Sequence, residues 1–413
     1  MSYPNLRHIR LFCACVQLGS MSRAAEQIGV TQPAASQGLA RMEAIFGAPL
    51  IDTRSGTARA TPEGRIVHAR AQRALELIRT GVARLRGPGG GQAAETRLTL
   101  PHLRALAAFA EGGSFSAAAR ILRQSEPAVH RTARDAEATL RTPLFEGSGR
   151  AIRLSSAGLS AARWSRLALN ELDNAAAEIR ELRGRFEGHV ALGTLPLART
   201  GIVPRAITAV GARHALASFS IAEGRYEALL RDLEMGRIDI LVGALRPHLA
   251  SSTLEQEELF TYRLSVVARA GHPLAGRRNL DVSDLAEYPW VMAREGTPSR
   301  AVFTALASRF PPGKPALRSV ETGSLGVARG ILMESDHLAL FSPLQIDYEM
   351  QAGFLSPLDF EVDDPGLAIG ITTRKRWLPT ALQREFIDTL RTVARAAAHP
   401  QTPQGPANTT PDL

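Results

Sequence analysis

The chain is poor in cysteine. Only Cys13 and Cys15 occur among its 413 residues. They lie two positions apart on a stretch whose spacing predicts a helix, so their side chains face different directions. This excludes a disulfide between them or a shared zinc site. We expect both to be buried as small apolar side chains.

Long apolar runs are missing as well. No stretch of about 18 consecutive apolar residues occurs, so no membrane span is predicted. The N-terminal stretch "MSYPNLRHIRLF" lacks the apolar segment of a secretory signal. The expected location is therefore the cytoplasm. The 45% hydrophobic and 22% charged residues are typical of a globular protein, and the length suits two or three domains.

Signatures of catalysis are absent too. The ten histidines are scattered without metal-ligand spacing, and no nucleophile elbow, phosphate-binding loop or zinc-protease motif occurs. The neighbouring carboxylates Asp363 and Asp364, and Asp281 and Asp284, lie in segments rich in turn residues and are interpreted as solvated. We therefore predict no catalytic residues, no metal site and no cofactor.

Acidic residues are scarce in the N-terminal third. Residues 1–158 contain 21 Lys and Arg against 11 Asp and Glu, whereas residues 159–413 contain 28 against 29. The net charge of +9 therefore belongs to the first third. Almost all of its basic residues are arginines, which suit bidentate contacts to phosphate and guanine. This asymmetry favours a region that binds a polyanion.

The same third contains an internal repeat. A shift of 94 residues aligns residues 6–64 with 100–158 without a gap. The identities run through the whole stretch and include Leu6/Leu100, His8/His102, Gly19/Gly113, Ser20/Ser114, Pro33/Pro127, Glu43/Glu137, Pro49/Pro143, Arg59/Arg153 and Gly64/Gly158. An ungapped match of this length predicts a duplicated domain.

Each copy is predicted to form two helices, a turn, a third helix and a short ribbon. In the first copy, Gly29 can adopt the positive φ of the turn, Thr31 caps the third helix, and Pro33 lies in its first turn. The inward positions follow a 4-3-4 spacing: Ala35, Leu39, Met42 and Phe46. The opposite face carries Gln32, Ser36, Gln37 and Arg41. These side chains suit base edges and phosphates in a major groove; the alternative is an ordinary solvated face.

The segment after this helix predicts a two-stranded wing. "APLIDTRSGTARATPEG" offers a short apolar step and a Gly/Ser turn, with Arg54 and Arg59 on either side, which suits contacts to a phosphate backbone. The whole pattern resembles the winged helix-turn-helix of LysR-type transcriptional regulators. The matching positions are Ser20, Ser22, Ala24, Ala25, residues 31–36, Met42, Glu43 and residues 47–50. Two features depart from the family pattern. Ile51 stands where the family usually has Phe, and Asp52-Thr53 precede Arg54 like a short insertion.

The resemblance implies that DNA is bound by Ser22, Thr31, Gln32, Pro33, Ser36, Gln37, Arg41, Arg54 and Arg59. In the second copy the corresponding candidates are His130, Arg131, Arg134 and Arg153. That copy keeps the inward spacing through Val129, Ala133, Ala136 and Leu140, but its surface differs. Glu126 replaces Gln32 and would repel phosphates, and Arg123 replaces the turn glycine at a cost of about 1 kcal/mol. Two alternatives stay open: a second DNA reader of different specificity, or a degenerate copy kept for packing and weak phosphate contact.

A long helix is predicted after each copy. Leu75, Ile78, Val82 and Leu85 form a 3-4-3 stripe in the first. Leu172, Ala175, Ile179, Leu182 and Phe186 form a 3-4-3-4 stripe in the second. The resemblance implies that such linker helices join two chains of a homo-oligomer. An alternative is that the two helices pair within one chain.

From residue 188 the pattern changes to alternating strands and helices. "GHVALGTL", "IDILVGAL", "YRLSVVAR", "YPWVMAR" and "HLALFSP" are strand-like, and "GIVPRAITAVGAR" and "YEALLRDLEMG" are helical. The segment resembles the family's effector-binding domain, an α/β domain with two lobes like those of periplasmic binding proteins. Ligands of such sheets bind beyond the carboxyl ends of strands.

Candidate effector-binding residues follow the predicted strands: Thr194, Leu195, Arg246, Thr297, Arg300, Thr322 and Ser342. Hydroxyls, backbone amides and an arginine suit a carboxylate or a sugar. The stretch 243–247 also resembles regulators of this family associated with sugars and aromatic acids. For each residue alone, a capping or turn role is the alternative.

The expected division of the chain is a winged domain at 4–62, a linker helix at 63–86, a Gly-rich linker at 87–96 and a second winged domain at 97–157. A second linker helix at 158–187, a two-lobed effector domain at 188–398 and a disordered tail at 399–413 follow. We predict a regulator that binds double-stranded DNA and senses a sugar or an organic or aromatic acid. The alternative is a small-molecule-binding enzyme with appended DNA-binding modules.

Overall fold

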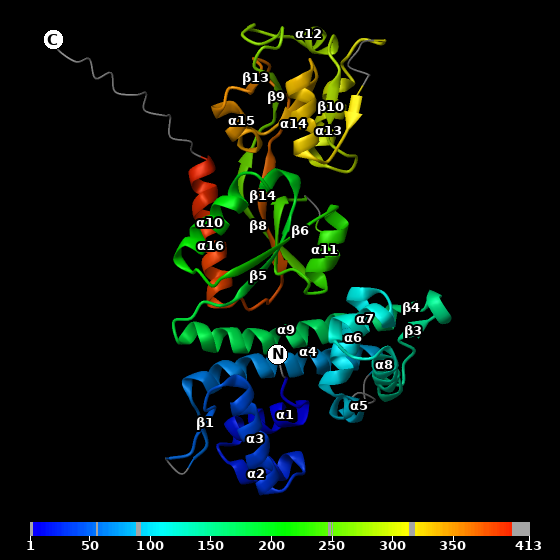
Figure 1. The fold of residues 1–413 in the computed structure, drawn as a ribbon, viewed down its shortest axis with the longest axis vertical. Coiled ribbons are helices and arrows are strands. Elements are labelled where there is room, and N and C mark those ends of the chain that lie inside the picture. Colours follow the sequence, from blue (N-terminus) through cyan, green and yellow to red (C-terminus); the bar gives the residue numbers. More distant parts are fainter. Residues whose placement is uncertain are drawn as a thin grey trace, which may run out of the picture.

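The structure is a computed structural model that describes residues 3–54, 57–87, 92–246, 249, 251–313 and 319–398. One small helical module lies below a pair of long helices, a second lies at one end of that pair, and two α/β lobes are stacked above it (Figure 1). The predicted fold class, two winged modules with linker helices followed by a two-lobed α/β domain, is confirmed. The expected disordered tail and Pro247 lie outside the described residues.

The two winged modules have the same order of elements. Module 1 consists of α1 (Leu6–Leu18), α2 (Met21–Ile28), α3 (Gln32–Phe46), β1 (Ile51–Asp52) and β2 (Arg59–Ala60). Module 2 consists of α6 (Leu100–Gly112), α7 (Phe115–Leu122), α8 (Glu126–Leu140), β3 (Phe145–Glu146), the 3-10 turn η1 (Gly149–Ala151) and β4 (Arg153–Leu154). Each helix and strand of module 1 begins and ends 94 residues before its counterpart in module 2.

The junction between wing and linker helix is built from the same atoms in both modules. Glu43 Oε1 accepts a hydrogen bond from Leu50 N at 2.8 Å, and Glu137 Oε1 accepts one from Leu144 N at 2.8 Å. A Cβ at either Gly64 or Gly158 would lie 2.0 Å from the carbonyl oxygen of Leu50 or Leu144. Glycine is therefore required at both positions, because the chain passes there in direct contact with another backbone.

The two linker helices, α4 (Pro62–Arg86) and α9 (Ser156–Leu182), pair with each other inside the chain. They run antiparallel, since Arg70 meets Glu178 at one end of the contact and Gly81 meets Trp164 at the other. Of the two arrangements that the sequence left open, the structure shows the intrachain one.

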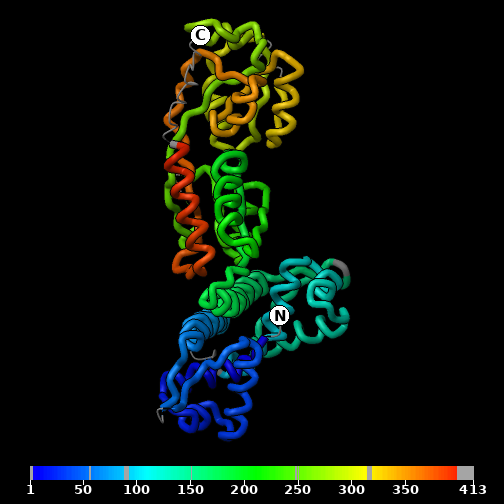
Figure 2. Tube along the Cα trace, turned by 60° about the vertical axis from the view of Figure 1, so that its left-hand side comes forward, coloured from blue at the N-terminus to red at the C-terminus, as the bar shows by residue number. Residues whose placement is uncertain are grey.

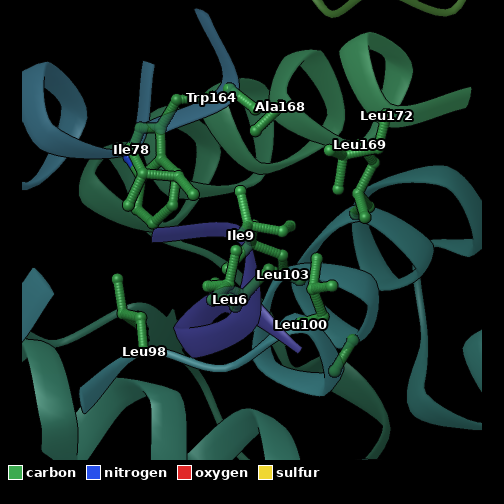
Figure 3. Packing of buried hydrophobic residues seen from close by; sticks show 14 of the residues in the cluster. Leu6, Ile9, Ile78, Leu98, Leu100, Leu103, Trp164, Ala168, Leu169 and Leu172 are labelled. Atoms are coloured by element: carbon green, nitrogen blue, oxygen red, sulfur yellow. The ribbon is translucent and has the colours of Figure 1, made fainter. Parts of the chain in front are cut away.

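Both modules and both linker helices share one apolar core. Leu6 and Ile9 of α1 lie in the same buried cluster as Leu100 and Leu103, their counterparts in α6 (Figure 3). The predicted stripe of α9 is wrong at its end. Leu182 is 53% exposed, and Phe186 lies beyond the helix, where its ring stacks on His214 of the first lobe.

The effector domain contains two five-stranded sheets. The first lobe has strand order β6-β5-β7-β14-β8 and the second has β11-β10-β12-β9-β13. In the first sheet β5 pairs in parallel with β6 and β7, and β14 is antiparallel to β7 and β8. The strands are β5 (His189–Thr194), β6 (Ser218–Glu223), β7 (Ile240–Ala244), β8 (Leu254–Tyr262), β9 (Ser265–Arg269), β10 (Trp290–Met292), β11 (Ser319–Glu321), β12 (Leu338–Phe341), β13 (Leu355–Pro357) and β14 (Leu367–Arg374).

Helices cover both sheets. They are α10 (Ile202–Arg213), α11 (Tyr226–Glu234), α12 (Val282–Ala286), α13 (Pro298–Ala307), α14 (Leu325–Glu334), α15 (Asp347–Gln351) and α16 (Ala381–Ala398), with short 3-10 turns η2 (Pro196–Ala198) and η4 (Pro343–Gln345). Each of the five segments predicted as strands contains a strand of the structure, and each of the two segments predicted as helices contains a helix. Strands β6, β8, β11, β13 and β14 were not predicted; β8 and β14 carry the chain into the second lobe and back.

Asp364 corrects one expectation. It was interpreted as solvated, but it is buried where the chain returns to β14. Its carboxylate accepts hydrogen bonds from Leu264 N at 3.1 Å and Gly366 N at 2.9 Å. The carboxylate therefore joins the outgoing and returning segments at the boundary between the lobes.

The first lobe is attached directly to the helix pair, which lies between it and module 1 in Figure 2. Glu181 of α9 accepts hydrogen bonds from Ala381 N and Leu382 N, the first amides of α16. Arg70 of α4 donates to the carbonyl oxygen of Leu378 at 2.8 Å. A helix N-terminus favours a carboxylate, so both linker helices hold the start of α16.

Residues 92–96, expected to belong to a Gly-rich linker, are helical in the structure. They lie in α5 (Gln92–Arg97), because the stretch "QAAET" consists largely of helix-forming residues. Along the described part of the chain, no helix combines the length and apolar character needed to cross a membrane.

Candidate nucleic-acid interface and ligand crevice

The outward face of α3 is open. Gln32, Ser36, Gln37 and Arg41 are all exposed, and none of their side chains forms a hydrogen bond or ion pair with another described residue. Ala35 and Met42 on the opposite face are fully buried. The helix therefore presents amide, hydroxyl and guanidinium groups on a rigid support, the groups that contact base edges and phosphates in a major groove.

Thr31 and Pro33 begin this helix. Thr31 occupies the N-cap position but makes no side-chain capping hydrogen bond, so the predicted cap is wrong. Pro33, at the second helical position, has no amide to donate. The exposed Thr31 hydroxyl is left for another partner. Ser22 is exposed on the neighbouring α2.

The wing of module 1 is the predicted antiparallel ribbon, with Asp52 opposite Arg59. Arg54 is 91% exposed and forms an ion pair with Asp52 at 2.7 Å. Hydrogen bonds from Arg54 lower the pKa of Asp52 to about 2. The charge of Arg54 is therefore partly compensated within the wing, whereas Arg59 is exposed on β2.

The corresponding face of module 2 is occupied by its own side chains. The ring of His130 lies 4.7 Å from that of Phe115. Arg134 donates to Glu137 at 2.7 Å and lies over the ring of Phe145. On the wing, Arg153 forms an ion pair with Glu146 at 2.8 Å. Three of the four predicted DNA contacts of module 2 therefore have partners inside the protein.

Arg131 is the exception. It is exposed and has no ion pair or hydrogen bond with a described residue. Its neighbours on α8 are acidic: Glu126 is exposed at the start of the helix, and Asp135 is hydrogen-bonded to His102 Nε2 at 2.8 Å. Since carboxylates repel phosphates, this face is less suited to DNA than that of α3.

An aromatic cluster explains why His130 turns inward. Phe109, Phe115 and Phe145 lie with ring centroids between 4.6 and 5.3 Å apart. They replace Cys15, Met21 and Ile51 of module 1. The larger rings extend the core of module 2 towards α8, and the imidazole at position 130 packs on their edge.

In the effector domain, Thr194, Leu195 and Arg246 meet at the ends of β5 and β7. Thr194 Oγ1 is buried without a hydrogen-bond partner among the described residues, and the Leu195 side chain is buried. The Arg246 guanidinium lies 4.7 Å from the ring centroid of Tyr226. It also donates to Gly296 O of the second lobe at 3.2 Å, so it bridges the two lobes. Burial lowers the pKa of Arg246.

The other predicted effector contacts serve turns and caps. Thr297 caps α13 by accepting from Arg300 N, Thr322 Oγ1 accepts from Ser324 N, and Ser342 Oγ accepts from Leu344 N. Arg300 forms an ion pair with Glu321 at 2.7 Å. The structure therefore does not bring these four together with Thr194 and Arg246 as free donors.

Sequence reasoning missed three polar groups that follow strands β5 and β6 at the carboxyl end of the first sheet. Arg199 Nε, Thr200 Oγ1 and Tyr226 OH are each buried without a partner among the described residues. The other guanidinium nitrogens of Arg199 contact Glu223 and the carbonyl oxygen of Thr194. Thr200 lies two residues before α10. A hydroxyl residue just before a helix that follows a buried strand is the signal that could have identified it.

Such buried polar atoms are costly unless they are hydrogen-bonded. Arg199 contacts Thr194 O and Tyr226 contacts Arg246, so these groups at the carboxyl end of the first sheet fit a polar ligand held between the lobes. No group of three His, Cys, Asp or Glu is placed to hold a metal ion among the residues that the structure describes.

Comparison with known families matches almost the whole chain. The family described as "LysR substrate binding domain" matches residues 183–395. The family described as "Bacterial regulatory helix-turn-helix protein, lysR family" matches twice, at residues 6–65 and 100–159. These two stretches correspond to modules 1 and 2, each with the first residues of its linker helix.

Two relatives cover different shares of the chain. The HTH-type transcriptional regulator GalR of Pseudomonas putida is 33% identical over 377 residues, which cover 90% of this chain and 92% of the relative. The regulator PcaQ of Agrobacterium fabrum is 30% identical over 288 residues, which cover 69% of this chain and 92% of PcaQ. At 90% coverage, the GalR alignment must include at least part of both modules.

A solved structure supports the fold. A full-length OxyR variant from Pseudomonas aeruginosa matches with a TM-score of 0.57 at 21% identity, covering 75% of this chain and 99% of that one. The relatives are transcriptional regulators, so the alternative of an enzyme with appended modules is not supported. The chain belongs to the LysR family of DNA-binding transcriptional regulators.

Proposed function

We propose that the chain regulates transcription through two unequal DNA-binding modules, residues 4–62 and 97–157, under the control of a ligand bound by residues 188–398. Module 1 recognises bases through Gln32, Ser36 and Gln37, with Arg41, Arg54 and Arg59 on flanking phosphates. The observation that carries this assignment is the open polar face of α3 on a helix whose opposite face is buried. A regulator of chromosomal genes works in the cytoplasm.

We infer that module 2 is a duplicate of module 1. The identical 94-residue offset of every helix and strand supports this inference, as does the double match to the family's helix-turn-helix domain. PcaQ and OxyR are covered almost completely yet match only 69% and 75% of this chain. The unmatched remainder is long enough to hold one extra module.

In this proposal module 2 contacts the DNA backbone only. His130, Arg134 and Arg153 are held by partners within the module, and breaking those contacts would reduce the gain from a base contact. Of the four candidates, only Arg131 has no side-chain partner among the described residues, and we assign it to a phosphate. Backbone contacts position a protein on DNA without specifying sequence.

The proposed ligand is an organic acid, aromatic or aliphatic, rather than a neutral sugar. Arg246 is partly buried and has no ion pair with a described carboxylate, so it suits a carboxylate ligand. Tyr226 supplies a hydroxyl beside it, and Thr194 and Thr200 supply two more at the same end of the first sheet. To change DNA binding, the acid must bind one arrangement of the lobes more tightly than another.

The DNA-binding proposal is tested by DNase footprinting on the gene's own upstream region. Wild type is expected to protect a site that Gln32→Ala/Ser36→Ala erases. Arg23→Ala, which removes an exposed arginine of α2 outside the proposed contacts, serves as the matched control. A footprint that survives the loss of Gln32 and Ser36 would contradict base recognition by α3.

The ligand proposal is tested by thermal-shift screening of the full chain against organic acids and sugars. An acid that stabilises wild type is expected to lose its effect in Arg246→Ala and to keep it in Arg278→Ala, an exposed arginine of the second lobe. Stabilisation by sugars alone, or equal stabilisation of Arg246→Ala, would overturn the assignment.

A further inference from the structure

The antiparallel contact between α4 and α9 joins two helices that occupy equivalent places in the 94-residue repeat. Two such helices could also pair like with like, α4 with α4 or α9 with α9 of a second copy. The side chains at the contact decide among these pairings, because the residues at four equivalent positions differ between the helices.

The first difference is a buried charge. Arg70 of α4 has no exposed surface. It donates to Glu171 at 2.8 Å and to both carboxylate oxygens of Glu178 at 3.0 and 2.8 Å. Burial opposes its charge, but these hydrogen bonds raise the pKa of Arg70 overall. A buried cation is tolerated only with such partners.

Pairing α4 with a second α4 would remove both partners. The residues of α4 that correspond to Glu171 and Glu178 are Leu77 and Arg84. Arg70 would then face an apolar side chain and a second cation in a buried place. This pairing is disfavoured on charge alone.

The second difference is one of size. Trp164, which takes the place of Arg70 in α9, lies against Gly81 of α4. A Cβ at Gly81 would be 2.3 Å from Trp164 Cδ1. The residue of α9 that corresponds to Gly81 is Ala175. Pairing α9 with a second α9 would therefore force a methyl group into each indole ring, and would leave Glu171 and Glu178 without Arg70.

We propose that this charge and size code matches α4 only with α9, that the two helices pair within one chain as the structure shows, and that a single chain is therefore a complete DNA-binding unit with two unlike modules. The inference deepens the proposed function, since it makes the operator of one chain asymmetric. A homo-oligomer of this protein then has to form through another surface.

A complementation experiment separates pairing within a chain from pairing between chains. Arg70→Glu places three carboxylates together, and Glu178→Arg places cations together, so each variant is expected to lose hydrogen-exchange protection of α4 and α9 by about tenfold or more. The double variant in one chain restores the charge balance and is expected to recover protection.

The decisive arm is the mixture of the two single variants, co-expressed. If α4 of one chain paired with α9 of another, each pairing in a mixed dimer would again join one Arg with one Glu, and protection would return. We expect the mixture to stay as poorly protected as the single variants. Recovery in the mixture would overturn the proposal.

A measurement on the wild-type chain covers the case in which the variants do not fold. Pairing within a chain is unimolecular, so exchange rates in α4 and α9 are expected to stay constant over about a hundredfold dilution. Rates that rise on dilution would show pairing between chains. Neither readout involves DNA, so absence of a footprint would contradict the proposed function without affecting this test.

Discussion

Modules 1 and 2 have the same backbone fold, but their third helices, α3 and α8, expose different side chains. The two junctions with the linker helices agree in their hydrogen bonds, with Glu43 and Glu137 each bound to a wing amide at 2.8 Å. The exposed faces do not agree. The face of α3 is neutral to basic and free, whereas α8 carries Glu126 and Asp135 and turns His130 onto Phe115.

The residues that fix the fold and the residues on the outward faces of α3 and α8 are therefore under separate constraints. Gly64 and Gly158 lie where the chain touches another backbone and cannot take a side chain without overlap, so they agree in both modules. Positions on the outward face contribute little to stability, so they are free to differ. Module 2 accordingly keeps its place against the linker helices while its surface is suited to a weaker contact.

The largest expected effect comes from the framework. Gly64→Ala and Gly158→Ala should each destabilise their own module by about 3 kcal/mol, because the new Cβ would overlap a carbonyl oxygen. Hydrogen exchange resolved by module measures the two losses. Gly211→Ala on α10, where a Cβ meets nothing within 4 Å, is the control. Unequal losses in the two modules would show that the frames are not equivalent.

The recognition faces should respond unequally to matched changes. Gln32→Ala/Ser36→Ala should weaken operator binding by about 10- to 100-fold, since each lost base contact costs roughly 1–3 kcal/mol. Glu126→Ala/His130→Ala changes the same positions of module 2 and should weaken binding little, or strengthen it through loss of a negative charge. Fluorescence anisotropy with labelled operator measures both; comparable weakening by the two pairs would contradict a backbone-only role for module 2.

Turn positions should show a smaller difference. Arg123 and Arg141 of module 2 adopt φ values of 53° and 48°, where module 1 has Gly29 and Gly47. A non-glycine residue in this region costs about 1–2 kcal/mol, and glycine loses roughly 0.4–1 kcal/mol more entropy on folding. Arg123→Gly and Arg141→Gly should therefore each stabilise module 2 by about 0.5 kcal/mol, measured by hydrogen exchange, whereas Gly47→Arg should destabilise module 1. A destabilising effect of both glycine variants would assign the arginines a contact that outweighs the strain.

The smallest expected effect concerns His8, whose equivalent in module 2 is His102. Burial, then repulsion by Arg41 and Arg7, lowers the pKa of His8 below its ordinary value of 6.5. The unfolded chain thus binds more protons than the folded one, and His8 removes stability as the pH falls through about 6.5. Arg41→Asp copies the Asp135 of module 2 and should raise the pKa of His8 in an NMR titration. An unchanged pKa would show that burial alone sets it.

Much of this fold could be predicted from the sequence because its signals are local or repeated. The 94-residue match located both modules, and the 4-3-4 spacing identified which side of α3 is buried. The open face of α3 follows directly from that spacing. The positive φ of Arg123 was predictable because Gly29 occupies the equivalent position in module 1. The positive φ of Arg141, whose equivalent is Gly47, was predictable in the same way but was missed.

The remaining features depend on contacts between distant residues. Nothing near Arg153 in the sequence shows that Glu146 will neutralise it across the wing. The substitution of Cys15 by Phe109 predicts an aromatic side chain but not that His130 will turn onto the enlarged core. Strand β8 was missed because its many glutamates do not resemble a buried strand. The burial of Asp364 was missed because its amide partners lie both before and after it in the sequence.

The most direct test of the account is a base-pair substitution scan of the operator at several salt concentrations, with wild type and Arg131→Ala. The account predicts that base pairs costing about 1–3 kcal/mol when changed fall in one half-site only. It also predicts that Arg131→Ala weakens binding equally on all sequences and lowers the salt slope by about 1. Base discrimination in two separate half-sites, with one of them lost in Arg131→Ala, would contradict it.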